Sequence, residues 1–120
     1  MLTKKIKNMK KPTLRKGAII NITARRWFDK RAGNTYHSVH VYVKSGTLEA
    51  FMDSPRTYGY GEQYLQTALG LVWERFIPCK GCQSNLPEVP ARLAYFWGLK
   101  EWYKINVTVS DVPHMKDLNF

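Results

Sequence analysis

Residues 19–52 alternate between apolar and polar side chains, and this alternation constrains the fold more than any other feature of the chain. Successive side chains of a β-strand point to opposite faces, so an alternating segment predicts a strand with one buried face. Residues 18–28 and 35–44 follow this pattern, and a turn at Ser45-Gly46 leads into a shorter strand over 47–53. The side chains expected on the inner face are Ile20, Ile22, Ala24, Phe28, His37, Val39, Val41, Val43, Leu48, Ala50 and Met52.

A helix over residues 61–76 is the expected cover for that inner face. Its apolar side chains recur every three or four residues, which produces one apolar stripe. The stripe consists of Leu65, Ala68, Leu69, Val72 and Phe76. Residues 102–110 alternate again and predict a strand at the edge of the sheet, and Pro90 suits the start of a short second helix over 90–98. We therefore predict an α+β fold with an antiparallel sheet of three to four strands and one main helix.

The length of 120 residues and the 44% of hydrophobic residues predict a single domain with one core. We place the domain at 17–120 and interpret residues 1–16 as a flexible basic arm. The chain has no apolar run of membrane-spanning length and no apolar N-terminal signal segment, so we expect a cytoplasmic protein without a membrane partner. Its two cysteines do not form a disulfide framework.

The net charge of +10 is concentrated at the N-terminus. Residues 1–16 contain seven lysines and arginines and no acid, while the remainder is nearly balanced. Such an arm suits an anionic partner, because neutralising phosphates releases counterions and strengthens binding at low salt. The alternative is a tail that only increases solubility. The lysines assigned to nucleic-acid contact are Lys4, Lys5, Lys7, Lys10 and Lys11.

The outer face of the predicted sheet combines aromatic and basic side chains. Proteins hold single-stranded nucleic acid on such faces, because the nucleobases stack on the aromatic rings and the phosphates pair with the basic side chains. The candidate residues are Arg25, Trp27, Lys30, Arg31, Tyr36, His40, Tyr42 and Lys44. Alternatively, this face is covered by another subunit, by the second helix, or by the C-terminal segment that is rich in Tyr95, Phe96, Trp97 and Trp102. Our first hypothesis is a non-enzymatic protein that binds single-stranded DNA or RNA with little sequence specificity.

The loop over residues 54–61 is rich in glycine and tyrosine, which suits either contact with a ligand or packing beside the helix. A second hypothesis is that the protein binds a host protein through an aromatic surface. The residues of that surface are Tyr58, Tyr60, Trp97 and Trp102. The many aromatic residues are also compatible with a homo-oligomer.

Metal and catalytic motifs are sparse. Cys79 and Cys82 have the spacing of half a zinc site, but His37 and His40 lie three residues apart on one strand and point to opposite faces, so they cannot complete it together. We therefore expect no cofactor and treat the cysteines as ordinary thiols, with zinc or a redox pair as alternatives. Either histidine, near Asp29 or Asp53, could serve as a general acid or base. No nucleotide-binding or hydrolase motif supports a particular reaction.

Two resemblances follow from these residues. Three antiparallel strands followed by a helix behind Gly59-x-Gly61 resemble the latter two-thirds of a double-stranded RNA-binding domain over residues 18–76. That family has a basic cluster where this chain has Glu62-Gln-Tyr64, so no binding residue is carried over. The string from Arg26 to Val39, with Tyr58-Gly-Tyr-Gly61 behind it, is similar to small proteins of bacteriophages and mobile elements. That resemblance implies an accessory or host-interaction role and supplies no catalytic residue.

Overall fold

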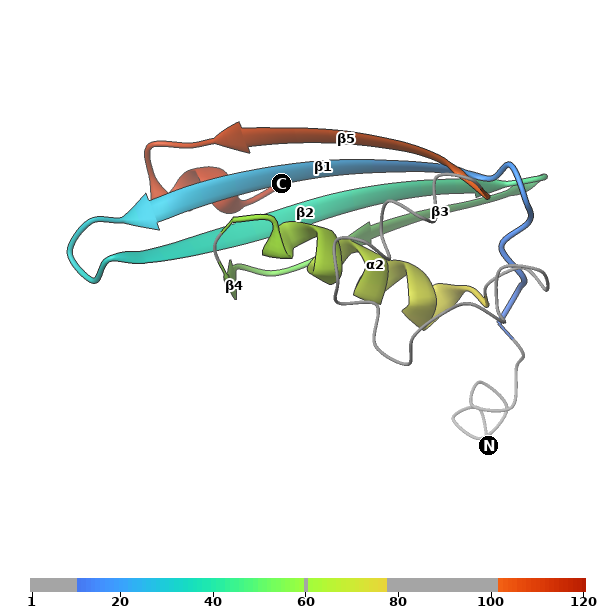
Figure 1. Ribbon diagram of the computed structural model, residues 1–120, viewed down its shortest axis with the longest axis horizontal. Coiled ribbons are helices and arrows are strands. Elements are labelled where there is room, and N and C mark those ends of the chain that lie inside the picture. The colour runs from blue at the N-terminus through green and yellow to red at the C-terminus, as the bar shows by residue number, and fades with distance from the viewer. Residues whose placement is uncertain (1–10, 60, 78–101) are drawn as a thin grey trace.

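The part of the chain that the structure describes folds as a β-sheet with one α-helix packed on one face (Figure 1). The computed structural model describes residues 11–59, 61–77 and 102–120. The elements are β1 (Ile19–Asp29), β2 (Asn34–Ser45), β3 (Leu48–Asp53), β4 (Thr57–Tyr58), α2 (Gln63–Arg75), β5 (Lys104–Asp111) and the 3-10 helix η1 (Met115–Leu118). The predicted α+β class is therefore confirmed. The second helix expected over 90–98 lies outside the described residues.

The sheet has the strand order β3-β2-β1-β5, and the short β4 pairs with β2. β1, β2 and β3 form the predicted antiparallel meander, with Ile22 opposite Val41 and Val41 opposite Met52. β5 lies at the edge of the sheet, as expected, but it runs parallel to β1. A parallel pair needs a long crossover connection, and here more than 70 residues that include α2 separate the two strands.

The core lies between α2 and the inner face of the sheet. The valines of β2 are almost completely buried there, together with Ile20 and Ile22 of β1 and the helix stripe. Phe28 and Leu48 are the exceptions, because their side chains are 53% and 47% exposed. Both lie near strand ends, and the β1–β2 hairpin extends past the start of α2 (Figure 1). The alternation thus predicted the face of these two residues, but it could not predict how far the helix reaches.

The packed domain begins before Gly17, which corrects the expected boundary. The Leu14 side chain is fully buried in the core. Its backbone N–H donates to the Ile77 carbonyl at 2.7 Å, and the Ile77 N–H donates to the Pro12 carbonyl at 2.9 Å. Residues 11–16 are therefore part of the fold, whereas residues 1–10 lie outside the described part of the chain. Within the described ranges, no helix has the length and apolar character needed to cross a membrane.

Candidate nucleic-acid interface

The sheet face opposite α2, here called the outer face, brings together six of the residues predicted to bind nucleic acid. The β1–β2 register pairs Trp27 with Tyr36 and Arg25 with Ser38, so these side chains share a face. The same alternation places further β2 side chains there. The six predicted residues on this face are Arg25, Trp27, Tyr36, His40, Tyr42 and Lys44. Lys30 and Arg31 lie exposed beyond the end of β1.

One aromatic group lies near the β1–β2 hairpin, and we call it the Trp27 cluster. The rings of Trp27 and Tyr36 are stacked with their centres 5.8 Å apart, and Tyr58 meets Tyr36 edge-on at 5.7 Å. The guanidinium carbon of Arg56 lies 5.5 Å from the centre of the Tyr36 ring. Tyr58 is 59% exposed, so it does not cap the core as one interpretation of its loop suggested. The cluster thus combines solvent-accessible rings with a cation.

A second aromatic group, the Phe51 cluster, surrounds His40 further along the sheet. The Tyr42 and Phe51 ring centres are 5.0 Å apart. The His40 ring lies 6.1 Å from Phe51 and 5.8 Å from Phe120. Phe51 is 61% exposed and Phe120 is 49% exposed. Neither phenylalanine was among the predicted site residues, although the alternation of β3 already assigned Phe51 to the outer face.

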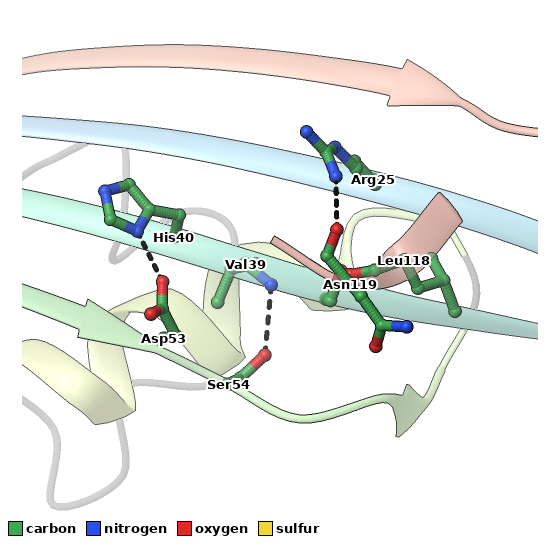
Figure 2. A network of polar contacts seen from close by, with 8 residues as sticks. Arg25, Val39, His40, Asp53, Ser54, Leu118 and Asn119 are labelled. Atoms are coloured by element: carbon green, nitrogen blue, oxygen red, sulfur yellow. Dashed lines mark hydrogen bonds and ion pairs between the residues drawn. The ribbon is translucent and has the colours of Figure 1, made fainter. Parts of the chain in front are cut away.

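Residues 115–120 cross the outer face between the two clusters. The Leu118 side chain is buried, and the Ser38 hydroxyl donates to the Leu118 carbonyl. Arg25 donates from one guanidinium nitrogen to the carbonyls of Asp117 at 3.2 Å and Asn119 at 2.6 Å, the latter shown in Figure 2. The covering segment expected from the sequence was the one that contains Trp97 and Trp102, whereas the structure places residues 115–120 on this face. The segment covers the middle of the face and adds the Phe120 ring to the site.

His40 pairs with Asp53 across β2 and β3 (Figure 2). An ionised carboxylate only accepts hydrogen bonds, so the imidazole Nδ1 carries a proton, and in the neutral form of the ring Nε2 is the acceptor nitrogen. Such a carboxylate-oriented imidazole can accept a proton or hydrogen-bond to a ligand. Among the residues that the structure describes, no group of three or more histidine, cysteine, aspartate or glutamate side chains could hold a metal ion.

His37 points to the opposite face, as predicted, and takes part in the packing of α2. Its Nδ1 lies 3.3 Å from the Gly59 carbonyl, which can only accept, so Nδ1 is protonated and Nε2 accepts from the Thr67 hydroxyl at 2.7 Å. Burial lowers the pKa of His37, and the hydrogen bond to Gly59 partly opposes that shift. A Cβ atom at Gly59 would lie 3.0 Å from the His37 ring. The close approach that Gly59 permits is therefore its contact with the His37 ring inside the protein.

A pocket of about 300 Å³ opens beside the Phe51 cluster. It lies between the β3–β4 connection and residues 115–120, and its polar and apolar walls come from both segments. The lining residues are Asp53, Ser54, Pro55, Arg56, Leu118, Asn119 and Phe120. Figure 2 shows the lining residues Asp53, Ser54, Leu118 and Asn119 together with His40.

The remaining predicted residues lie elsewhere or outside the described ranges. The Lys11 ammonium donates to the Trp73 carbonyl of α2 at 2.9 Å, away from the outer face. Trp102 packs partly buried against the core, with the Lys16 ammonium 5.2 Å from its ring centre. Tyr58 and Trp102 were both assigned to the aromatic surface that would bind a host protein. In the structure Tyr58 is exposed, whereas Trp102 packs against the core. The predicted residues outside the described ranges are Lys4, Lys5, Lys7, Lys10, Tyr60, Cys79, Cys82 and Trp97.

No family model, curated protein or solved structure matches this chain.

Proposed function

We propose that the protein binds single-stranded nucleic acid on its outer face and is not an enzyme. The observation that carries this proposal is the presence of two aromatic clusters on the sheet face that α2 leaves open, with arginines beside both. Single strands are held on aromatic rings because every base offers a flat face for stacking. Basic side chains next to those rings attract the phosphates that connect the bases.

The spacing of the clusters suits an extended strand. Tyr36 and Tyr42 are six residues apart on β2, which corresponds to about 20 Å along a strand. A single strand that lies along β2 would contact both clusters and cross residues 115–120 between them. Each stacked base contributes on the order of 1–3 kcal/mol, so a few such contacts suffice for measurable affinity.

The charges around the outer face also favour an anionic ligand. Lys44 is exposed at one end of β2, whereas Lys30 and Arg31 are exposed beyond the other end. Two acids on this face already have hydrogen-bond partners within the protein: Glu49 accepts from the Tyr42 hydroxyl at 2.7 Å, and Asp53 pairs with His40. Lysines of the first ten residues would add a salt-dependent attraction that does not depend on sequence.

Fluorescence anisotropy with labelled single-stranded DNA, single-stranded RNA and duplex DNA at several salt concentrations tests the proposal. We expect tighter binding of the single strands, with affinity that falls steeply as salt increases. Phe51→Ala should weaken single-strand binding roughly fivefold to a hundredfold, as expected for the loss of one stacked base. Phe28→Ala is the matched control, because Phe28 is similarly exposed but belongs to the inner-face alternation.

The two variants decide between a specific face and general charge attraction. Equal effects of Phe51→Ala and Phe28→Ala would contradict the outer-face proposal. Absence of binding to any nucleic acid would also contradict it, and would favour the hypothesis of a protein partner.

A further inference from the structure

We propose that the pocket between the β3–β4 connection and residues 115–120 receives one base of the bound strand and selects bases that carry an exocyclic amino group. The pocket would accept adenine, cytosine or guanine in preference to thymine or uracil. This inference rests on the proposed function and adds base selection to a face that otherwise binds by stacking.

The size of the pocket fits a single nucleotide. Its volume of about 300 Å³ is at the lower end of the range for small-molecule sites. Phe120 supplies an aromatic wall that is 49% exposed, and Arg25 holds the segment that carries this ring. A base in the pocket would therefore meet a ring that the fold already positions.

Asp53 supplies the selectivity. Its carboxylate accepts from His40 through one oxygen, and its side chain is 59% exposed beside the pocket. A carboxylate has about four acceptor sites and no donor, so it needs N–H groups from its ligand. Cytosine N4, adenine N6 and guanine N2 provide amino groups, whereas the N3–H of thymine or uracil lies between two carbonyl oxygens that a carboxylate repels. Acceptor chemistry at Asp53 thus discriminates between the two sets of bases.

Two neighbouring side chains complete the polar lining. Ser54 Oγ accepts from the Val39 N–H at 3.0 Å, which orients the hydroxyl beside the pocket (Figure 2). Arg56 lines the pocket and also lies 5.5 Å from the centre of the Tyr36 ring. Within the described ranges, Arg56 forms no ion pair with an acid. Its guanidinium is therefore placed to contact the phosphate between a base in the pocket and a base at the Trp27 cluster.

The test compares oligonucleotides of equal length made only of deoxyadenosine, deoxycytidine or thymidine, by anisotropy at one salt concentration. We expect the full chain to bind the deoxyadenosine and deoxycytidine strands at least about fivefold more tightly than the thymidine strand, the lower limit for one good base contact. Asp53→Asn should remove this preference, because an amide can donate to thymine carbonyls as well as accept. Asp111→Asn is the control, since it neutralises another exposed carboxylate that pairs with a basic side chain, Arg26, but lies outside the pocket, and it should keep the preference.

Circular dichroism establishes that both variants are folded, which we expect because the side chains of Asp53 and Asp111 are both exposed. Equal binding of all three strands by the native chain, or an unchanged preference in Asp53→Asn, would overturn the pocket inference and leave the stacking proposal standing. Failure to bind any strand would overturn both. A further experiment uses free cytidine monophosphate to compete with the labelled strand. If it competes as well as the unlabelled deoxycytidine strand at equal nucleotide concentration, the pocket binds free nucleotides, and its assignment to a base of a bound strand is overturned.

Discussion

The guanidinium carbon of Arg25 lies 4.3 Å from the centre of the Phe120 ring. The same side chain donates to the Asn119 carbonyl at 2.6 Å and to the Asp117 carbonyl at 3.2 Å. Arg25 was predicted from the sequence to contact phosphates, yet in the structure its donors hold residues 115–120 on the outer face. A planar guanidinium can donate several hydrogen bonds and stack on a ring at the same time, which a lysine ammonium cannot do.

Replacing Arg25 tests whether it positions residues 115–120. We expect Arg25→Lys to increase the rate of amide hydrogen exchange in this segment, because the fork of donors and the stacking on Phe120 are both lost. Exchange in β1 and β2 should stay unchanged. Lys44→Arg changes another cation of the outer face and is the control, for which no effect on residues 115–120 is expected. Unchanged exchange in Arg25→Lys would show that Leu118 and Ser38 hold the segment without Arg25.

The pKa of His37 predicts how stability depends on pH. Burial lowers this pKa in the folded state from its usual value of 6.5, so the folded protein keeps the imidazole neutral while the unfolded chain takes up a proton. The free energy of unfolding should therefore fall as the pH decreases below about 6.5, until the folded-state pKa is reached. Above that range the contribution of His37 is complete and constant.

Urea denaturation at pH 7.5 and pH 5.5 measures this contribution, and His37→Gln should show a smaller difference between the two pH values than the native chain. An NMR titration of the His37 ring protons in the native chain gives the pKa without a substitution. A value at or above 6.5 would contradict the account.

Thr67→Val tests the hydrogen bond between α2 and β2. The substitution keeps the shape of the side chain but removes the hydroxyl that donates to His37 Nε2 at 2.7 Å. A buried acceptor without a partner costs about 1–3 kcal/mol, so we expect a loss of that size in the free energy of unfolding. Thr47→Val, at an exposed position in the β2–β3 turn, should change the free energy of unfolding by less than about 0.5 kcal/mol. Equal effects of the two substitutions would contradict a structural role for the bond.

Leu14 defines where the packed domain begins. Because its side chain is fully buried, we expect Leu14→Ala to lower the free energy of unfolding by about 2–5 kcal/mol. Leu48→Ala, at a position that is 47% exposed, should lower the free energy of unfolding by less than about 1 kcal/mol. Tests of the basic arm should therefore delete residues 1–10 only, since a chain that begins at Gly17 loses part of the core. An equal cost for both leucines would contradict the burial of Leu14.

The alternation of residues 19–52 was sufficient to predict three strands, their inner face and the opposite orientations of His37 and His40. The helix and the edge strand β5 followed from their own periodicity. The parallel pairing of β5 with β1 could not be predicted, because alternation is the same in parallel and antiparallel strands. The two-residue β4 was missed for a related reason, since a pair of residues has no detectable period.

The candidate site was harder to predict than the fold. Sequence alone indicated which residues of β1 and β2 share the outer face, but it did not single out residues 115–120 as the segment that covers part of it. It did not indicate that Phe120 would lie beside His40, because this contact joins residues 80 positions apart through an irregular segment. The pocket beside Asp53 depends on the same contact, so no local pattern could reveal it.

The most direct test of the central claim is a map of backbone amide chemical-shift changes by NMR when a short single-stranded oligonucleotide is added to the full chain. We predict that the largest changes fall on outer-face residues of β1, β2 and β3 and on residues 115–120, and that α2 residues such as Leu69 stay unperturbed. Changes concentrated on α2, or confined to the basic residues before Lys11, would contradict binding on the outer face.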